Sequence, residues 1–211
     1  MRKLVVLSFV TLDGVMQAPG GPNEDTSGNF KHGGWVAGYW DGVMEKVMDE
    51  QMRSPYDLLL GRKTYELFAA HWPNAKDDPF ADRLNTAKKY VVSTKPRKLD
   101  WNNSTLVTGD IPEEIWKLKS QNGPELQVHG SSNLIQTLLK HDLIDEFRLK
   151  IFPITIGQGK RLFGEHSIPA AFKILESKTS TTGVIVATYR RDGEIKTGSF
   201  DLDSGPRPAR P

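Results

Sequence analysis

The sequence predicts a three-layer α/β domain with a mostly parallel central sheet and antiparallel strands at its C-terminal edge. Over the first two thirds, short Val- and Leu-rich runs alternate with segments of helical periodicity, which is typical of parallel strands joined by helices. The last third changes to strand patterns separated by T-T-G and R-D-G-E, and Asp-Gly is a strong hairpin signal. No repeat or long linker interrupts the chain. We therefore expect one domain over residues 1–200.

The first half of the chain begins with a strand and a long loop. Residues 3–10 form an apolar run typical of a buried strand, and the glycine- and proline-rich segment 13–35 follows as a loop. Apolar residues at helical spacing predict a helix within 36–52. A second strand over 57–60 and a second helix over 64–70 complete this half.

The second half supplies the remaining elements in the same alternating order. K-K-Y-V-V-S-T is a third strand ending in hydroxyls, and 105–107 is a fourth. Pro112 favours a helix start, so 113–121 is expected to be helical. E-L-Q-V-H-G is a strand before the helix S-S-N-L-I-Q-T-L-L-K-H-D, for which we expect a serine cap. Segment 143–157 has the pattern of a strand near the sheet centre, and 172–200 holds two strands or three.

Composition excludes several classes of protein. The 211 residues include no cysteine, which excludes disulfides and thiolate metal sites. The net charge of +2 is too small to predict bulk nucleic-acid binding. No apolar run approaches the roughly 20 residues that span a bilayer. We read M-R-K-L-V-V-L-S-F-V as a strand rather than a targeting segment, and we expect a cytoplasmic protein whose tail, 201–211, is disordered.

Three predicted strand ends carry anion-binding chemistry. Residues Gly61, Arg62, Lys63 and Thr64 join a strand to a helix, although cations at a helix N-terminus oppose its dipole. A phosphate bound by free backbone N–H groups would explain them. Two further strand ends have similar chemistry: the first offers Gly130, Ser131 and Ser132, and the second offers Ser93, Thr94, Lys95 and Arg97.

Each of these segments also has an ordinary interpretation, as a solvated basic helix start or a capped helix. Three together are stronger evidence, because ligands of open α/β sheets lie outside the carboxyl ends of the strands. The usual G-x-G-x-x-G fingerprint and the Walker spacing are missing. The five histidines lack metal-ligand spacing, and no G-x-S-x-G is present.

Three carboxylates, Asp41, Glu45 and Asp49, follow at four-residue steps on the predicted helix within 36–52. Such a row is typical of a solvated helix face. Alternatively, one of them borders a pocket and orients or protonates a polar heterocycle.

Several motifs, in order, resemble those of known reductases. S-F-V-T-L-D-G-V-M, L-L-L-G-R-K-T-Y-E-L-F, V-V-S-T-K-P and V-H-G-S-S-N-L-I-Q-T-L-L are similar to the first strand and three cofactor-binding segments of dihydrofolate reductases. The stretch from N-L-I-Q-T-L-L to G-Q-G-K-R-L-F-G resembles more closely the reductase domain of bifunctional riboflavin biosynthesis enzymes. The resemblance covers about residues 3–190.

The resemblance implies a dihydrofolate reductase-like fold that binds NADPH. Phosphate would be held by Gly61, Arg62, Lys63 and Thr64, and the adenosine 2′-phosphate by Ser93, Thr94 and Lys95. The pyrophosphate would lie on Gly130, Ser131, Ser132 and Asn133, and the nicotinamide beside Val10, Gly14, Val15 and Met16. Dihydrofolate reductases bind the pterin with an acidic residue on their first helix, for which Asp41 and Glu45 are the candidates.

The sequence departs from both relatives at specific points. The glycine cluster is G-S-S, and the zinc-deaminase half of the riboflavin enzymes has no counterpart. We expect a stand-alone NADPH-dependent reductase of a pterin- or pyrimidine-like heterocycle, with 13–35 closing over the nicotinamide. The expected partners are that substrate and a second copy of the chain, without nucleic acid or membrane. The alternative is a non-catalytic NADP(H)-binding or partner-binding module of the same fold.

Overall fold

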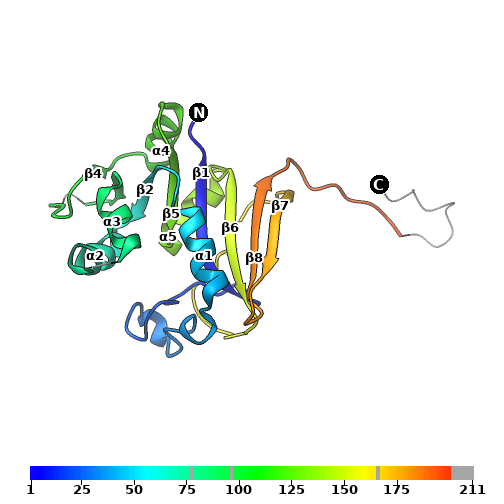
Figure 1. The fold of residues 1–211 in the computed structure, drawn as a ribbon. Helices are drawn as coiled ribbons and strands as arrows, with labels where there is room; N and C mark the ends of the chain where they lie inside the picture. The colour runs from blue at the N-terminus through cyan, green and yellow to red at the C-terminus, as the bar shows by residue number, and fades with distance from the viewer. Residues whose placement is uncertain (77, 96, 165–166, 201–211) are drawn as a thin grey trace.

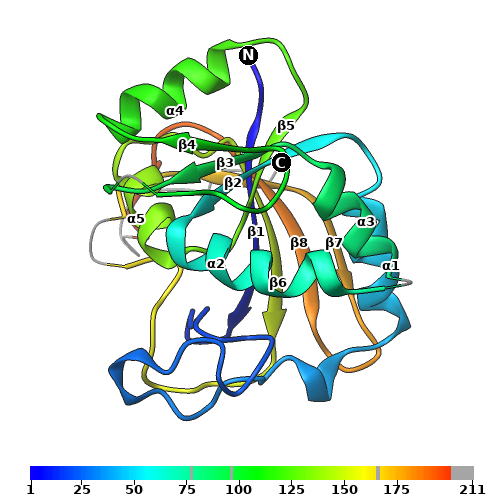
Figure 2. The ribbon, with the colours of Figure 1, turned by 90° about the vertical axis from the view of Figure 1, so that its left-hand side faces the viewer.

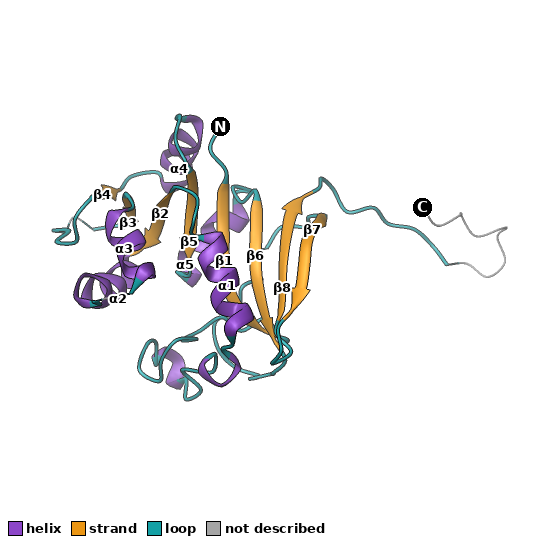
Figure 3. Ribbon diagram, in the orientation of Figure 1, coloured by secondary structure: helices purple, strands orange, loops and turns teal. Residues whose placement is uncertain are grey.

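A single eight-stranded sheet organises the chain (Figures 1 and 3). The computed structural model describes residues 1–76, 78–95, 97–164 and 167–200. The strand order is β4-β3-β2-β5-β1-β6-β8-β7. The six strands from β4 to β6 are parallel, and β8 pairs antiparallel with both β6 and β7. The prediction of a mostly parallel sheet with antiparallel C-terminal strands is confirmed.

The strands are four to eight residues long. Their bounds are β1 Leu4–Thr11, β2 Tyr56–Gly61, β3 Lys89–Val92, β4 Ser104–Val107, β5 Glu125–His129, β6 Glu146–Phe152, β7 Phe172–Thr179 and β8 Ile185–Arg191. Leu7 of β1 lies opposite both His129 of β5 and Arg148 of β6. This register places the end of β5 beside the middle of β1 and β6.

Helices cover both faces of the sheet (Figure 2). The α-helices are α1 Gly42–Gln51, α2 Arg62–His71, α3 Pro79–Thr86, α4 Ile111–Ser120 and α5 Ser132–Lys140. Short 3-10 helices occupy Ser27–Asn29, Ala37–Tyr39 and Trp72–Asn74. Helices α4 and α5 pack with Leu4, Val6 and Val128 on one face, and α1, α2 and α3 cover the other.

Several local predictions need correction. The helix expected within 36–52 is confined to α1, because Asp41 is extended and starts the helix there. Helix α3 was not among the predicted elements. No third strand follows β8 within the described residues up to 200, and residues 192–200 lead away from the sheet (Figure 1). The predicted disordered tail, 201–211, lies outside the described residues.

No helix among the described residues is long and apolar enough to cross a membrane.

Candidate active site at the carboxyl edge of the sheet

A continuous cleft opens where the parallel strands end. Its volume is about 1810 Å³, well above the range of roughly 300–1,000 Å³ typical of pockets for one drug-sized ligand. Its lining includes Leu7–Phe9 of β1, the ends of β2, β3 and β5, the loop 16–27, Met48 of α1 and Met52 just after that helix. This is the edge at which open α/β sheets bind ligands.

Two strand-to-helix turns are joined in this cleft by one side chain. The Gly61 N–H donates to Ser131 Oγ at 2.8 Å, and that hydroxyl donates to Thr64 Oγ1 at 2.6 Å. A Cβ on Gly61 would lie 2.7 Å from Ser131 Oγ, so glycine is required for the approach. Ser131 itself is left-handed, with φ 71°, which costs a non-glycine residue about 1 kcal/mol or more. The two hydroxyl contacts hold it there.

The predicted serine cap of α5 is therefore wrong. Ser131 precedes the helix, but its side chain makes no capping hydrogen bond because the hydroxyl is committed to the β2–α2 turn. The N-terminus of α2, after Gly61, also lacks a side-chain cap.

The other α-helices are capped by aspartate. Asp41, Asp78 and Asp110 accept backbone N–H groups at the starts of α1, α3 and α4. The first turns of α2 and α5 read R-K-T-Y and S-N-L-I, without a carboxylate. The two helices that begin at the cleft thus keep free N–H groups and a positive dipole end, which suits a bound anion.

The cations at the β2–α2 turn differ in whether a carboxylate already pairs with them. Arg62 and Arg97 both pair with Glu66, the former at 2.9 Å. Lys63 lines the cleft, is exposed, and has no ion-pair partner among the residues that the structure describes. Lys63 is the cation best placed to meet a phosphate.

The structure brings most predicted cofactor residues together. The cleft lining includes Gly61, Arg62, Lys63, Thr64, Ser93, Thr94, Gly130, Ser131, Ser132, Asn133 and Met16. Lys95 follows at the exposed end of the β3 turn and is not part of the lining. Val10, Gly14 and Val15 also lie outside it, since Val10 belongs to the main core and Val15 packs with Ala18 and Phe30. Their place along β1 is taken by Leu7, Ser8 and Phe9.

The two predicted catalytic carboxylates do not line the cleft. Asp41 accepts from Met44 N at 2.9 Å and, with its other oxygen, from Thr181 N and Oγ1 at 2.8 and 2.6 Å. The Thr181 hydroxyl and the helix N–H lower the pKa of Asp41 to about 2. Glu45 is exposed one turn later. The geometry assigns Asp41 to tethering α1 to the β7–β8 turn.

A buried polar strip at the sheet centre was missed by the sequence reasoning. Gln127 of β5 and Lys150 of β6 both contact Gln51 of α1, and alternation along the strands puts Glu125 and His129, and Glu146 and Arg148, on the same face of the sheet. Both segments alternate polar and apolar residues, E-L-Q-V-H and E-F-R-L-K-I-F. Central parallel strands are usually apolar on both faces, so this alternation was the available signal.

His129 and Lys150 reach the cleft from the strip. Gln127 Nε2 donates to Gln51 O at 3.1 Å and to Glu125 Oε1 at 2.6 Å, so its Oε1 accepts from His129 Nε2 at 2.8 Å. This fixes the Nε2–H tautomer. Burial, with Lys150 and Arg148 nearby, lowers the pKa of His129 to about 3, and the ring is neutral at pH 7.

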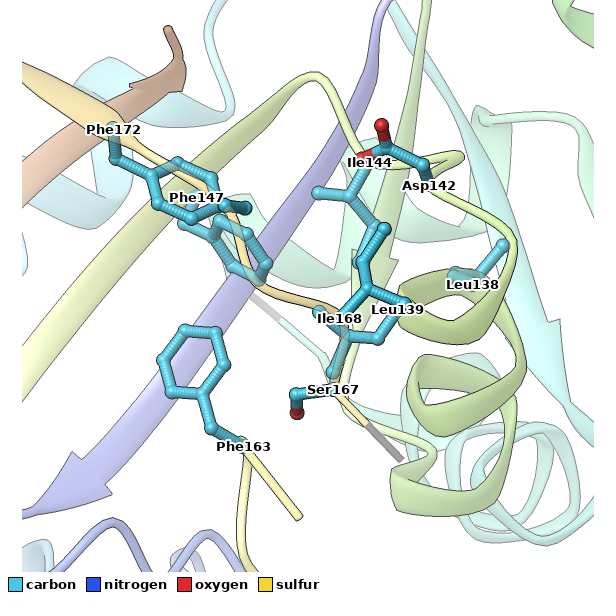
Figure 4. Close-up of a pocket in the computed structure, with 10 residues that line it drawn as sticks. Leu138, Leu139, Asp142, Ile144, Phe147, Phe163, Ser167, Ile168 and Phe172 are labelled. Atoms are coloured by element: carbon cyan, nitrogen blue, oxygen red, sulfur yellow. The ribbon is translucent and has the colours of Figure 1, made fainter. Parts of the chain in front are cut away.

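A second pocket, of about 150 Å³, lies on the α5 face between the helix and the segment after Phe163 (Figure 4). Its lining is apolar except for Asp142 and Ser167, and the Asp142 carboxylate is bonded to Arg191. It offers little for catalysis.

Comparison with known families agrees with this architecture. The sequence profile described as the RibD C-terminal domain matches residues 2–186. The chain belongs to the RibD C-terminal domain family. It is thereby a member of a reductase-type family, as the resemblance implied.

Two curated relatives come from Bacillus subtilis (strain 168), and both are described as uncharacterized. YyaP is 32% identical over 141 residues, which are 64% of this chain and 74% of YyaP. YwjB is 24% identical over 164 residues, 78% of this chain and 84% of YwjB.

Solved structures show a dihydrofolate reductase-like fold. A putative riboflavin biosynthesis protein from Shewanella sp. PV-4 matches with a TM-score of 0.70 and 24% identity, over 90% of this chain and 99% of that one. A pyrimidine reductase-like protein from Corynebacterium diphtheriae gives 0.62 and 10%, over 92% and 93%. Dihydrofolate reductase from Enterococcus faecalis, complexed with NADP(H) and RAB-propyl, gives 0.58 and 14%, over 90% and 96%. The predicted fold is confirmed.

Proposed function

We propose that this protein is an NADPH-dependent reductase of a small heterocyclic substrate. One observation carries the proposal: two uncapped helix N-termini, joined through Ser131, open onto one cleft large enough for a dinucleotide and a second ligand. The family and the fold support it, because reductases of both related types share this architecture.

The residues of the cleft fit the cofactor. The free N–H groups at the starts of α2 and α5 would hold the pyrophosphate, since neither first turn brings a carboxylate against it. Lys63, with Ser93 and Thr94 at the end of the neighbouring strand β3, would hold the 2′-phosphate. Met16 and Leu7 would border the nicotinamide. NADPH supplies the hydride when bound, and the protein supplies binding and orientation.

Two substrates are the first candidates, following the resemblance. One is dihydrofolate, and the other is the ribosylamino-pyrimidine of riboflavin synthesis. Neither Asp41 nor Glu45 lines the cleft, and Asp41 is bonded to Thr181, so a pterin would lack the carboxylate expected to recognise it. This favours the pyrimidine as the first compound to test.

Fluorescence titration with NADPH and NADH tests the cofactor assignment. Trp40 and Trp72 line the cleft, so energy transfer to the nicotinamide reports binding. We expect NADPH to bind at least about tenfold more tightly than NADH, which corresponds to about 1.4 kcal/mol. Lys63→Glu should weaken NADPH binding about tenfold and NADH binding much less, because only NADPH carries the 2′-phosphate.

The matched control is Lys196→Glu, which makes the same charge change at an exposed residue beyond β8. It should leave both affinities unchanged. Equal losses of NADPH and NADH affinity in Lys63→Glu would contradict the 2′-phosphate contact. Binding of neither nucleotide to the wild-type chain would contradict the proposed function, whereas tight binding without oxidation of any heterocycle would favour the non-catalytic module.

A further inference from the structure

Burying charged groups opposes folding, so the charged residues of the polar strip on β5 and β6 must be compensated by partners or retained for a function. Most of it is internally compensated. Arg148 forms two parallel hydrogen bonds to Glu125, each of 2.8 Å, and its Nε donates to Glu146 at 2.9 Å. Lys3 approaches Glu146 from the surface at 3.4 Å. These contacts make the Arg148 end of the strip a closed ion-pair network.

Lys150 is different from the rest of the strip. Its side chain is 1% exposed, and its ammonium donates to the Gln51 side-chain oxygen at the last residue of α1. The ring centroid of Phe9 lies 5.7 Å away. Among the described residues, no carboxylate forms an ion pair with it. A buried ammonium at the floor of a cleft, with one side-chain acceptor, has N–H groups left for a ligand.

The charged groups around Lys150 come from three elements. Arg148 on its own strand repels the ammonium, and His129 on β5 is neutral. The carboxylates of α1 beside Gln51 are engaged elsewhere, Asp49 with Arg83 and Glu50 with Lys178.

The neighbouring strands add no charge beside the ammonium. The residues paired with Lys150 are Phe9 on β1 and Val186 on β8. Burial, with the smaller repulsion from Arg148, lowers the pKa of Lys150 to about 7. The group therefore releases its proton readily at neutral pH, and as pH rises through 7 the protonated form is lost.

We propose that Lys150 is the proton donor of the reduction, acting on the nitrogen or oxygen of the substrate double bond. The inference rests on the proposed function. The substrate carbon accepts the hydride, and with it two electrons, from NADPH, which becomes NADP⁺. The Nζ–H bond of Lys150 breaks as the new N–H or O–H bond forms. The resulting neutral amine takes a proton from water before the next turnover. The substrate class is a heterocycle with a C=N or C=O acceptor.

Lys89 provides a matched control within the same sheet. It is also fully buried, and burial lowers its pKa to about 8. Its ammonium donates to Asn85 O and Ala87 O, both at 2.8 Å, and lies over the Trp101 ring. It does not line the cleft. Lys89 is therefore a structural buried lysine, and Lys89→Met should not affect the reaction.

The experiment compares wild type, Lys150→Met, Lys150→Arg and Lys89→Met as full-length chains. NMR of ¹³C-labelled lysine side chains between pH 5 and 10 gives the titration midpoint of Lys150, assigned by the signal that Lys150→Met removes. The same samples are titrated with NADPH and assayed for NADPH oxidation with dihydrofolate and with the ribosylamino-pyrimidine. Methionine keeps the shape of the lysine stem, so the fold should persist.

We expect a midpoint near 7 and NADPH affinity within twofold of wild type in all variants. NADPH oxidation should fall at least about 100-fold in Lys150→Met, a typical contribution of a general acid, and stay unchanged in Lys89→Met. Wild-type kcat should decline as pH rises through 7. Lys150→Arg should be about as slow as Lys150→Met, and its residual rate should show no decline through pH 7, because arginine does not release its proton.

Two results would overturn the proposal: a Lys150 midpoint above about 9, or wild-type oxidation rates in Lys150→Met. Either leaves the proposed function standing as long as NADPH still binds. Failure of the wild-type chain to bind NADPH refutes the proposed function instead. If wild type oxidises neither compound, a midpoint above about 9 still overturns the proposal, since such a lysine holds its proton at neutral pH.

Discussion

Asp41 was a candidate for substrate binding because of its spacing from Glu45 and Asp49, but its hydrogen bonds stabilise the fold. Its two oxygens are divided between the start of α1 and the turn after β7, contacts that lie 140 residues apart in sequence. The sequence shows the four-residue steps of Asp41, Glu45 and Asp49. It does not show the contact with Thr181, because that residue is distant in the sequence and reaches Asp41 only in the folded protein.

Replacing Asp41 tests this structural role. Asp41→Ala should lower the melting temperature at pH 7, because the helix cap and the Thr181 contact are lost together. The pKa of Asp41 is lowered to about 2, so its contribution is present above the unfolded value near 3.8 and is lost as pH falls through 2. The difference in melting temperature should therefore shrink toward pH 2, as measured by circular dichroism.

The matched control is Glu45→Ala on the exposed face of the same helix, which should leave the melting temperature nearly unchanged. NADPH affinity should stay within twofold of wild type in both variants. A loss of NADPH oxidation in Asp41→Ala, with an unchanged melting temperature, would contradict the structural role.

At the scale of elements, the β2–α2 and β5–α5 turns act as one unit. The strands pair side by side, and Ser131 links the turn of one to the first helical residues of the other. The Ser131 hydroxyl contacts the β2–α2 turn instead of capping helix α5. Both helices consequently present free N–H groups to the same cleft.

Gly61→Ala should separate the two turns. The new Cβ would lie 2.7 Å from Ser131 Oγ and 2.9 Å from its Cβ, so the β5–α5 turn must shift. We expect NADPH affinity to fall at least tenfold and stability by about 1–3 kcal/mol, in the range for overpacking. Titration with NADPH and urea unfolding measure the two effects.

Gly42→Ala is the corresponding control, because a Cβ there has nothing within 4 Å. It should leave NADPH binding unchanged. Wild-type affinity in Gly61→Ala would show that the joined turns do not hold the cofactor.

At the scale of the whole molecule, the loop after β1 is bound to the segment after β6. Gln17 accepts from Lys160 N at 3.0 Å and donates to Asp25 O and Ser27 O, each at 2.9 Å. Lys160 forms an ion pair with Asp25. Lys160 lies 143 residues after Gln17 and 135 residues after Asp25. The loop expected to close over the nicotinamide is thus held by a segment that is distant in the sequence.

Lys160→Met should loosen this loop. We expect a several-fold weaker NADPH affinity and faster proteolysis within 18–27, measured by titration and by mass spectrometry of limited digests. Lys31→Met, at an exposed position of the same loop, is the control and should change neither. Unchanged proteolysis in Lys160→Met would mean that the remaining Gln17 contacts hold the loop unaided.

The predicted homodimer stays a prediction. The edge strand β7 exposes Ile174 and Leu175, which are 57% and 45% accessible. These two side chains offer an apolar surface against which the second copy expected from the resemblance would pack.

The sequence by itself determined the layers of the fold and the position of the three turns at which we predict anion binding. Strand and helix periodicities are local, and a Gly followed by hydroxyls or cations after an apolar run is visible without any tertiary contact. That is why Gly61, Ser93 and Gly130 were predicted as strand ends, and why the sheet was predicted to be parallel and then antiparallel.

Only the tertiary structure decided which polar residues face the cleft. His129 and Lys150 belong to the consecutive strands β5 and β6, but β1, from the start of the chain, lies between these strands in the sheet, and both side chains line the same cleft. Asp41 does not line the cleft, and its carboxylate is bonded to Thr181, a residue near the other end of the chain. Which side of a strand is buried under which helix depends on strand order, and strand order is set by the packing of the whole chain rather than by any local segment.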